Sequence, residues 1–308
     1  MIVGVIDIGS NTIRLSIYKA EQEKLTLLLH KKTMAGLIGF IKNGEMSQKG
    51  IKRACEVLCR YQHILSNFEI AETYVFATAS LRNITNTEEA VAFIRQSTGI
   101  HVEILSGIEE AELDFFGAVH DAELKNGILI DIGGGSTELV PFKDGKMLQA
   151  SSIPIGSLAM YRKHVKKLFP KEKECEEIRE AVIDQLKELR HLKGAHYPVI
   201  CGVGGTIRAA GKLYNDRFGL KTENREMEVS GIQKVLEDLS GTDREICDRI
   251  LPIVPDRIHI LKPGMLILEA LMNAFQSKQI LISRYGVREG YLLKKQEIQH
   301  TQSLPLNR

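Results

Sequence analysis

Hydrophobic and polar residues follow two different periods along this chain. Three short apolar-rich runs near the N-terminus are joined by tight connections and predict an antiparallel meander of strands. These runs are residues 2–8, 12–19 and 25–32. A second meander is predicted near residues 127–132, 136–142 and 147–153. Apolar residues that recur every three to four positions predict amphipathic helices at 47–67, 87–98 and 172–193. The sequence therefore predicts an α/β protein with mixed sheets.

The two meanders share one motif at their first turn. The segment from Ile6 to Leu15 aligns without a gap with the segment from Ile130 to Leu139, at a constant offset of 124 residues. Each copy carries an aspartate just before a glycine turn. The economical interpretation is two related domains, 1–120 and 121–285, each contributing one phosphate-binding hairpin to a shared cleft. A chance match of two short loops is the alternative.

Glycine turns of this kind suit phosphate ligands. Without side chains, several backbone N–H groups can point into one concavity, and phosphate oxygens accept from them. The candidate phosphate-binding residues of the two turns are Gly9, Ser10, Asn11, Arg14, Gly133, Gly134, Gly135, Ser136 and Thr137. Asp131 and Glu138 flank the second turn, and carboxylates beside phosphate call for a divalent cation. The motif predicts a metal–phosphate ligand.

Other polar positions support two interpretations each. Arg14 follows the first turn and would neutralise phosphate, or it is an ordinary solvated arginine. Gly205 and Thr206 turn a buried strand into a helix, which is a third candidate phosphate contact or a tight connection that needs small residues. Arg82 follows a predicted strand at 74–77 and would line a polyanion path or cap the surface.

A helix start with two glutamates supplies a candidate base. Ser106 and Glu109 have the spacing of a capping box. Glu110 points to a different side of the same helix, from which it could face the cleft and orient a water.

Composition narrows the range of partners. The 308 residues are 44% hydrophobic and 26% charged, as in a globular protein. The net charge is only +2, so the overall electrostatic potential does not indicate binding to nucleic acid or to a membrane. One basic cluster comprises Arg162, Lys163, His164, Lys166 and Lys167. It is a solvated helix face by default, or a guide for a long anionic substrate if it borders the cleft. No signal-like N-terminus, no bilayer-length apolar run and scattered cysteines predict a cytoplasmic protein without a membrane partner.

With these residues in place, the chain resembles the exopolyphosphatase and guanosine-pentaphosphate phosphohydrolase (Ppx/GppA) family of the actin, Hsp70 and sugar-kinase superfamily. The matching segments are Asp7–Asn11 with Arg14, Ser106–Ala111, Asp131–Leu139, Gly202–Thr206 and Tyr285–Gly290. The resemblance implies two ribonuclease-H-like (actin-like ATPase) domains with mixed sheets and a cleft between them. It also implies that the last helix, about 286–300, joins the first domain.

The resemblance implies a function as well. Members hydrolyse the terminal phosphoanhydride of inorganic polyphosphate, and many convert pppGpp to ppGpp, using Mg²⁺. Glu110 matches the family's catalytic base, while Asp131, Gly133 and Glu138 match its metal and phosphate residues. Arg257 is the match for an arginine linked to substrate binding. The expected partners are polyphosphate, pppGpp or both, with no nucleic acid, and the family suggests a homodimer.

Two departures from the family bear on the substrate. Relatives often carry arginine where this chain has Glu112, which would weaken polyanion binding near the base. Larger members add a C-terminal helical domain, so we expect this chain to prefer shorter polymers or the alarmone. Two rival functions remain open: an ATP-dependent small-molecule kinase of the same superfamily, and a non-catalytic sensor of polyphosphate or alarmone.

Overall fold

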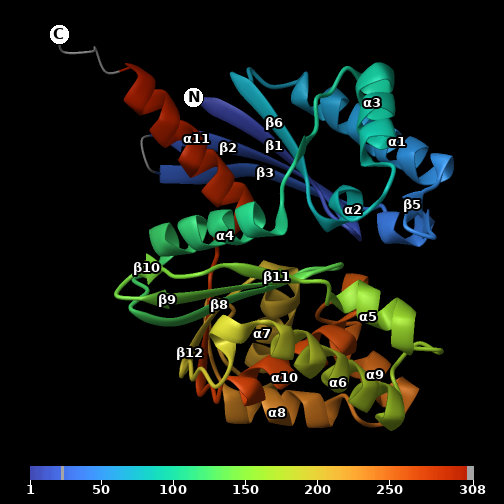
Figure 1. The fold of residues 1–308 in the computed structure, drawn as a ribbon, viewed down its shortest axis with the longest axis vertical. Coiled ribbons are helices and arrows are strands. Elements are labelled where there is room, and N and C mark those ends of the chain that lie inside the picture. The colour runs from blue at the N-terminus through green and yellow to red at the C-terminus, as the bar shows by residue number, and fades with distance from the viewer. Residues whose placement is uncertain (22–23, 304–308) are drawn as a thin grey trace. The chain divides into compact units, whose positions relative to one another are not determined.

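The computed structural model describes residues 1–21 and 24–303, with side-chain surroundings described as far as residue 297. The chain forms two compact units (Figure 1). Unit 1 comprises Met1–Glu110 and the chain from Arg288 onward, and unit 2 comprises Ala111–Val287. Each unit is a mixed sheet with helices on both faces, which confirms the predicted α/β class.

Unit 1 is built on a five-stranded sheet with the order β3-β2-β1-β6-β7. Its strands are β1 (Ile2–Ile8), β2 (Thr12–Glu21), β3 (Lys24–Met34), β6 (Glu72–Ala77) and β7 (Glu103–Ile104). The first three strands pair antiparallel as predicted, while β6 and β7 run parallel to β1. A small ribbon of β4 (Ile41–Lys42) and β5 (Glu45–Met46) follows the turn η1 (Leu37–Phe40).

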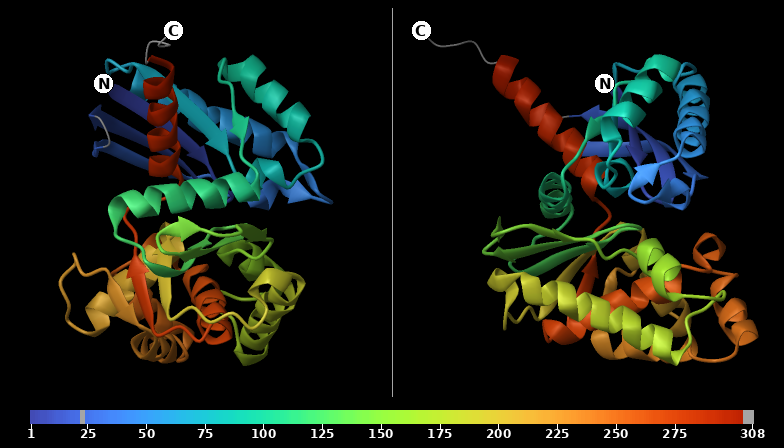
Figure 2. Two further views of the ribbon diagram at one scale, coloured as in Figure 1. Left: turned by 60° about the vertical axis from the view of Figure 1, so that its left-hand side comes forward. Right: turned by 45° about the vertical axis from the view of Figure 1, so that its right-hand side comes forward.

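Helices cover the two faces of this sheet because successive strand residues point to opposite sides. One face packs on α1 (Gln48–Leu65) and α3 (Thr87–Thr98), with the short α2 (Ala79–Arg82) after β6. On the other face, Phe76 packs on Tyr291 of α11 (Val287–Ser303), at 5.1 Å between ring centroids. Figure 2 shows α11 lying across the strands of unit 1.

Unit 2 repeats this plan in a seven-stranded sheet with the main order β10-β9-β8-β12-β14-β13. Its strands are β8 (Asn126–Ile132), β9 (Thr137–Lys143), β10 (Lys146–Met147), β11 (Ser151–Ile153), β12 (Val199–Val203), β13 (Glu226–Glu228) and β14 (Gln279–Ile282). The predicted third strand of the second meander is therefore two short strands, β10 and β11, which both pair with β9. β8, β12 and β14 are parallel, as β1, β6 and β7 are in unit 1.

Most helices of unit 2 cover one face of its sheet. They are α5 (Ser157–His164), α6 (Glu172–Glu188), α7 (Gly204–Arg217), α8 (Val229–Asp238), α9 (Asp243–Ile250) and α10 (Leu261–Ala274), with the turns η2 (Arg190–Leu192) and η3 (Pro255–Arg257). The other face packs on α4 (Gly107–Asp121) through Ala111, Phe115 and Ala118. The helix predicted to reach residue 193 ends at Glu188, because Leu189 leaves the helical region with φ −89° and ψ 80°.

The last parallel strand of each core, β7 in unit 1 and β14 in unit 2, is followed by a helix that packs on the other sheet. α4 follows β7 of unit 1 but packs from Ala111 onward on the sheet of unit 2, and α11 follows β14 of unit 2 but packs on the sheet of unit 1. Glu289 of α11 is buried and accepts from the Tyr18 hydroxyl of β2. Among the described helices, none combines the length and apolar character needed to cross a membrane.

Candidate active site

Two hairpin tips have the same backbone geometry. The Gly9 N–H donates to the Thr12 carbonyl at 3.0 Å, and the Gly133 N–H donates to the Ser136 carbonyl at 2.9 Å. A Cβ added to either glycine would lie 3.1 Å from the carbonyl that its own N–H binds. The motif repeated in the sequence is thus repeated in three dimensions, which a chance match of loops would not produce.

Each tip leaves a pair of backbone donors for a ligand. In the described part of the chain, the N–H groups of Ser10 and Asn11 meet no protein acceptor, and the same holds for Gly134 and Gly135. These pairs are equivalent at the offset of 124 residues. Adjacent N–H groups in a glycine turn form a concavity suited to anions. Both tips can therefore hold phosphate oxygens through their backbone alone.

The carbonyl groups of the second tip are already occupied by α5. The Ser157 N–H donates to the Gly133 carbonyl at 2.9 Å, and the Leu158 N–H donates to the Gly134 carbonyl at 3.0 Å. A Cβ at Gly156 would lie 2.4 Å from the Gly134 carbonyl carbon, so this close approach requires glycine. The first turn of α5 fixes the tip. Sequence analysis missed Gly156 because the requirement comes from a tertiary contact.

Charge differs between the two hairpins at one equivalent position. In unit 1, Arg14 lies opposite Asp7 on the neighbouring strand, with 3.5 Å between Nη1 and Oδ2. In unit 2, the corresponding pair is Glu138 opposite Asp131. Directly opposed residues share one face of a sheet, so unit 2 places two carboxylates together where unit 1 has an ion pair. Unit 1 thus carries an arginine at this position, while unit 2 carries a second carboxylate.

Two neighbours set the positions of the unit 2 carboxylates. The Ser152 hydroxyl donates to Glu138 Oε1 at 2.9 Å, and Glu138 is 1% exposed. A Cβ built on Gly204 would lie 1.9 Å from Asp131 Oδ1, so only glycine leaves room for this carboxylate at the start of α7. Gly204 also has φ +81°. The backbone conformation of Gly204 and its contact with Asp131 therefore both exclude a side chain at this position.

These carboxylates fit a hard cation such as Mg²⁺, but not a site made of protein ligands alone. Across the residues that the structure describes, no group of three or more His, Cys, Asp or Glu side chains could hold a metal ion. Mg²⁺ usually takes one or two carboxylates and completes its shell with water and substrate phosphates. Asp131 and Glu138 provide such a pair.

Hydroxyl groups at the strand ends have a structural use. Ser80 donates to the Ile8 carbonyl at 3.0 Å, and Thr206 donates to the Ile132 carbonyl at 2.8 Å, again at equivalent positions. Thr137 donates to the Ile155 carbonyl at 2.5 Å and is fully buried. The hydroxyls of Thr137 and Thr206, both predicted to bind phosphate, are therefore occupied by protein acceptors. Gly205 occupies the first turn of α7.

Glu110 lies in the first turn of α4 and pairs with Arg82. Arg82 Nη1 is 2.7 Å from Glu110 Oε2, and the two side chains are 14% and 12% exposed. The predicted capping box is also present, with Ser106 N–H to Glu109 Oε2 at 2.8 Å and Glu109 N–H to Ser106 Oγ at 3.1 Å. Hydrogen bonding to Ser106 lowers the pKa of Glu109. The two glutamates thus have different partners.

The remaining predicted residue, Arg257, lies at the end of η3 in unit 2 and is half-buried. Two residues later, the His259 ring packs edge-on against Tyr161 of α5, at 5.1 Å between centroids. Burial lowers the pKa of His259. The Arg257 segment is therefore a neighbour of the helix that holds the second hairpin tip.

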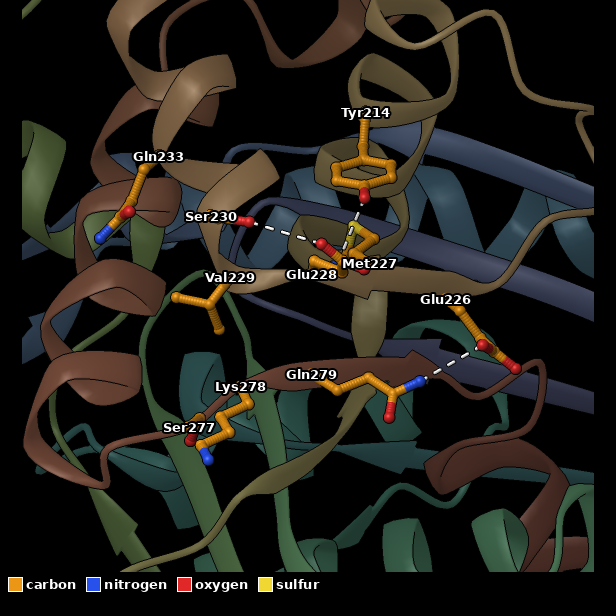
Figure 3. Close-up of a pocket in the computed structure, with 10 residues that line it drawn as sticks. All are labelled: Tyr214, Glu226, Met227, Glu228, Val229, Ser230, Gln233, Ser277, Lys278 and Gln279. Atoms are coloured by element: carbon orange, nitrogen blue, oxygen red, sulfur yellow. Dashed lines mark hydrogen bonds between the residues drawn. The ribbon is translucent and has the colours of Figure 1, made fainter.

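A separate cavity of about 730 Å³ lies at the β13 edge of unit 2 (Figure 3). Its wall carries Glu226, which accepts from the Gln279 amide at 3.2 Å, and Glu228, which accepts from the Ser230 hydroxyl at 3.5 Å. None of the predicted site residues lines it. The cavity is distinct from the phosphate hairpins.

Two units with the same order of five core strands and the same glycine hairpin define a duplicated α/β protein with a ribonuclease-H-like fold. The family model described as the Ppx/GppA phosphatase family matches residues 16–298. The chain belongs to this family.

Individual relatives agree with this assignment. Exopolyphosphatase 1 of Mycobacterium leprae is 23% identical over 304 residues, which covers 96% of this chain and 89% of the relative. The crystal structure of an exopolyphosphatase from Cytophaga hutchinsonii superposes with a TM-score of 0.85 at 23% identity, covering 96% of this chain and 98% of that one. The Aquifex aeolicus member of the Ppx/GppA family gives a TM-score of 0.79 at 23% identity, covering 97% and 98%.

Proposed function

We propose that this protein is an exopolyphosphatase, which hydrolyses the terminal phosphoanhydride bond of inorganic polyphosphate. The observation that carries the proposal is the repeated hairpin, whose two copies each offer a pair of backbone N–H groups without a protein acceptor among the described residues. Membership of a phosphatase family and the exopolyphosphatase relatives support it. A substrate made only of linked phosphates gives every such donor an oxygen to bind.

In the proposed mechanism, residues of this chain place charged and polar groups around the phosphates and accept one proton. The hairpin N–H groups and Arg14 hold phosphoryl oxygens, and Arg82 fixes the Glu110 carboxylate at 2.7 Å. Water attacks the terminal phosphorus, its proton passes to Glu110, and the bond from that phosphorus to the bridging oxygen breaks. The products are orthophosphate and a chain one phosphate shorter. Phosphoryl transfer depends mainly on positioning and charge stabilisation, so no covalent nucleophile is required.

Asp131 and Glu138 would hold Mg²⁺. When bound, the ion would offset the negative charge that develops on the phosphoryl oxygens. Gly204 leaves room for Asp131, and the Ser152 hydroxyl donates to Glu138 Oε1. The 5′-triphosphate of pppGpp ends in the same kind of anhydride bond, so the proposal includes pppGpp as a second substrate.

The test is phosphate release by the wild-type protein from polyphosphates of graded length and from pppGpp, with and without Mg²⁺. No acceptor alcohol is present, so a kinase would release no phosphate from these substrates. We expect Mg²⁺-dependent release of orthophosphate, one unit at a time. Polyphosphate binding without turnover would instead identify a sensor and contradict the proposal.

A further inference from the structure

Helix α1 carries two cysteines one turn apart, at the border between its buried face and solvent. Cys55 is 8% exposed, and Cys59 is an exposed free thiol. Both lie in the interior of a helix of 18 residues, so both have regular helical geometry. Residues four apart in an α-helix are neighbours on its surface, with ~5–6 Å between their Cβ atoms. The two thiols therefore lie on the same side of α1, on successive turns.

This side of α1 faces the end of α3. The Gln62 amide, three residues beyond Cys59, donates to the Thr98 carbonyl at 3.0 Å. Burial is the main reason that the pKa of the Cys55 thiol is raised, and the adjacent Cys59 raises it further, while Ser97 of α3 opposes the increase through a hydrogen bond. Cys59 lies between these two contacts along the helix. The pair therefore occupies the boundary between α1 and α3, where each cysteine is within the electrostatic reach of the other.

The helix prevents the two thiols from forming a disulfide. A disulfide requires Cβ atoms ~3.5–4.5 Å apart, which is less than the ~5–6 Å that the helix sets. The backbone of α1 would have to distort to close this gap. Its buried residues on these turns, Ala54, Val57 and Leu58, are at most 1% exposed and packed in the core of unit 1, so they oppose such a distortion. The pair is therefore expected to remain a dithiol.

The spacing of the thiols fits a single metal ion between the two sulfur atoms. Thiolate–metal bonds are ~2.3 Å long, so two thiolates bound on opposite sides of one ion are ~4.6 Å apart. Rotation about χ1 brings sulfur atoms on neighbouring turns to such a separation. Zn²⁺ requires four ligands, and among the residues described there is no group of three or more His, Cys, Asp or Glu side chains for a metal. Two soft ligands alone complete the linear coordination of a monovalent soft ion such as Cu⁺.

We propose that Cys55 and Cys59 form a binding site for a soft monovalent metal ion of the Cu⁺ class, which links two successive turns of α1. Each thiol loses its proton as the ion binds, because the thiolate is the ligand. Cys59 is open to solvent and receives the ion, and the buried Cys55 shields it. The site belongs to unit 1 and uses none of the residues assigned to phosphate or Mg²⁺. The inference is therefore independent of the proposed exopolyphosphatase function.

The test is an anaerobic titration of the full chain with Cu⁺ in competition with a colorimetric Cu⁺ chelator, together with ultraviolet absorption from thiolate-to-copper charge transfer. The variants Cys55→Ser and Cys59→Ser each remove one ligand. Cys247→Ser is the matched control, because it removes a half-buried thiol of α9 in unit 2. A spacing control combines Cys59→Ser with Gln62→Cys. It keeps all five cysteines, but its two thiols on α1 are seven residues apart, which is ~10.5 Å along the helix axis.

We expect one tightly bound Cu⁺ per chain, with charge-transfer absorption, in wild type and in Cys247→Ser. Affinity should fall in Cys55→Ser, in Cys59→Ser and in the spacing control by more than the roughly 10- to 100-fold that is lost when only a group beside a ligand is changed. Cu⁺ should raise the midpoint of thermal unfolding in wild type and Cys247→Ser alone, because an ion that binds only the folded state stabilises it.

Two results would overturn the inference. The first is wild-type affinity in Cys59→Ser or in the spacing control, since both alter exposed positions and should leave the fold intact. The second is rapid formation of a Cys55–Cys59 disulfide under mild oxidation with the helical content unchanged, because the sulfur atoms would then be closer than a regular α1 allows.

Discussion

Arg82 holds Glu110 at 2.7 Å through Nη1, and the same nitrogen donates to the Leu105 carbonyl at 3.0 Å. Leu105 directly precedes the capping box that starts α4. One guanidinium group thus fixes both the start of the helix and the carboxylate that the helix presents. Arg208 makes the equivalent contact in unit 2, donating to the Ser283 carbonyl at 3.4 Å, but no carboxylate follows there at the matching place.

Replacing Arg82 should affect turnover more than binding. In Arg82→Ala, Glu110 loses its fixed partner, and a misplaced base should lower kcat by roughly 10- to 100-fold, which is less than the roughly 100- to 10,000-fold lost with the base itself. Arg82→Lys keeps the charge and should recover part of that loss, although it lacks the planar fork of arginine. Steady-state kinetics with polyphosphate measure both variants. Equal kcat in wild type and Arg82→Ala would exclude a positioning role.

Gly204→Ala should disrupt the site as well as the backbone. A methyl group there would meet Asp131 Oδ1 at 1.9 Å, and φ is +81°. Gly194→Ala is the matched control, because Gly194 has φ +69° but nothing within 4 Å of a built Cβ. Left-handed backbone costs an alanine roughly 1–2 kcal/mol, so both variants should lose stability.

The two glycine variants should differ in activity. At a temperature where both are folded, kcat should fall about 100-fold in Gly204→Ala and stay near wild type in Gly194→Ala, since positioning errors near a reacting centre carry large rate penalties. Phosphate release measures kcat, and chemical denaturation measures the free energy of unfolding. If Gly204→Ala had normal kinetics, Asp131 would not need its present position.

The Mg²⁺ requirement should depend on the unit 2 carboxylates. Asp131→Asn and Glu138→Gln each remove one hard anionic ligand, so the Mg²⁺ concentration for half-maximal activity should rise at least about tenfold. Asp144→Asn, at an exposed turn with φ 52°, is the control and should leave that concentration unchanged. Removal of Mg²⁺ by a chelator should abolish activity in all three variants. If Asp131→Asn showed the same dependence on Mg²⁺ concentration as wild type, Asp131 would not be a ligand of the metal.

The sequence was sufficient for the features that depend on local spacing. The aspartate and glycine of each turn lie at fixed separations, and both the duplicated hairpin and the Ser106–Glu109 capping box follow from such spacing. The strand order β3-β2-β1-β6-β7 and its repeat in unit 2 could not be predicted from spacing alone. The alternation of strands and helices nevertheless indicated the α/β fold class.

Features that depend on tertiary contacts could not be predicted from the sequence. Arg82 was equally compatible with a polyanion path and a surface cap, because its partner is 28 residues away. Gly156 is required by the tip of a hairpin that lies more than twenty residues earlier. The packing of α4 on the sheet of unit 2 was not predicted, because apolar residues such as Ala111 and Phe115 do not indicate which sheet they cover.

Stability at low pH should depend on Asp121. Its fully buried carboxylate accepts from Arg284 Nε at 2.7 Å and from Arg225 Nη1 at 2.6 Å. Burial by itself would raise the pKa of Asp121, but hydrogen bonds from Arg284 and the two guanidinium charges outweigh it and lower the pKa. Because the folded pKa lies below the ordinary aspartate value of about 3.9, the stabilisation is present above that value and is lost as the pH falls through the folded pKa.

The check is the free energy of unfolding of wild type and Asp121→Asn between about pH 7 and pH 2. The variant should be less stable by roughly 1–3 kcal/mol at pH 7, and this difference should shrink below about pH 4. A difference that stays constant across the whole range would show that the Asp121 charge does not stabilise the fold.

The central claim, that Glu110 accepts the proton of the attacking water, is tested most directly by the rate of phosphate release from polyphosphate in Glu110→Gln beside Glu109→Gln. The two glutamates are adjacent, but Glu109 caps the helix through Ser106. We expect kcat to fall about 100- to 10,000-fold in Glu110→Gln, and to remain within about twofold of wild type in Glu109→Gln, whose cap costs ~1 kcal/mol of stability. Glu110→Gln with near wild-type kcat would contradict the account.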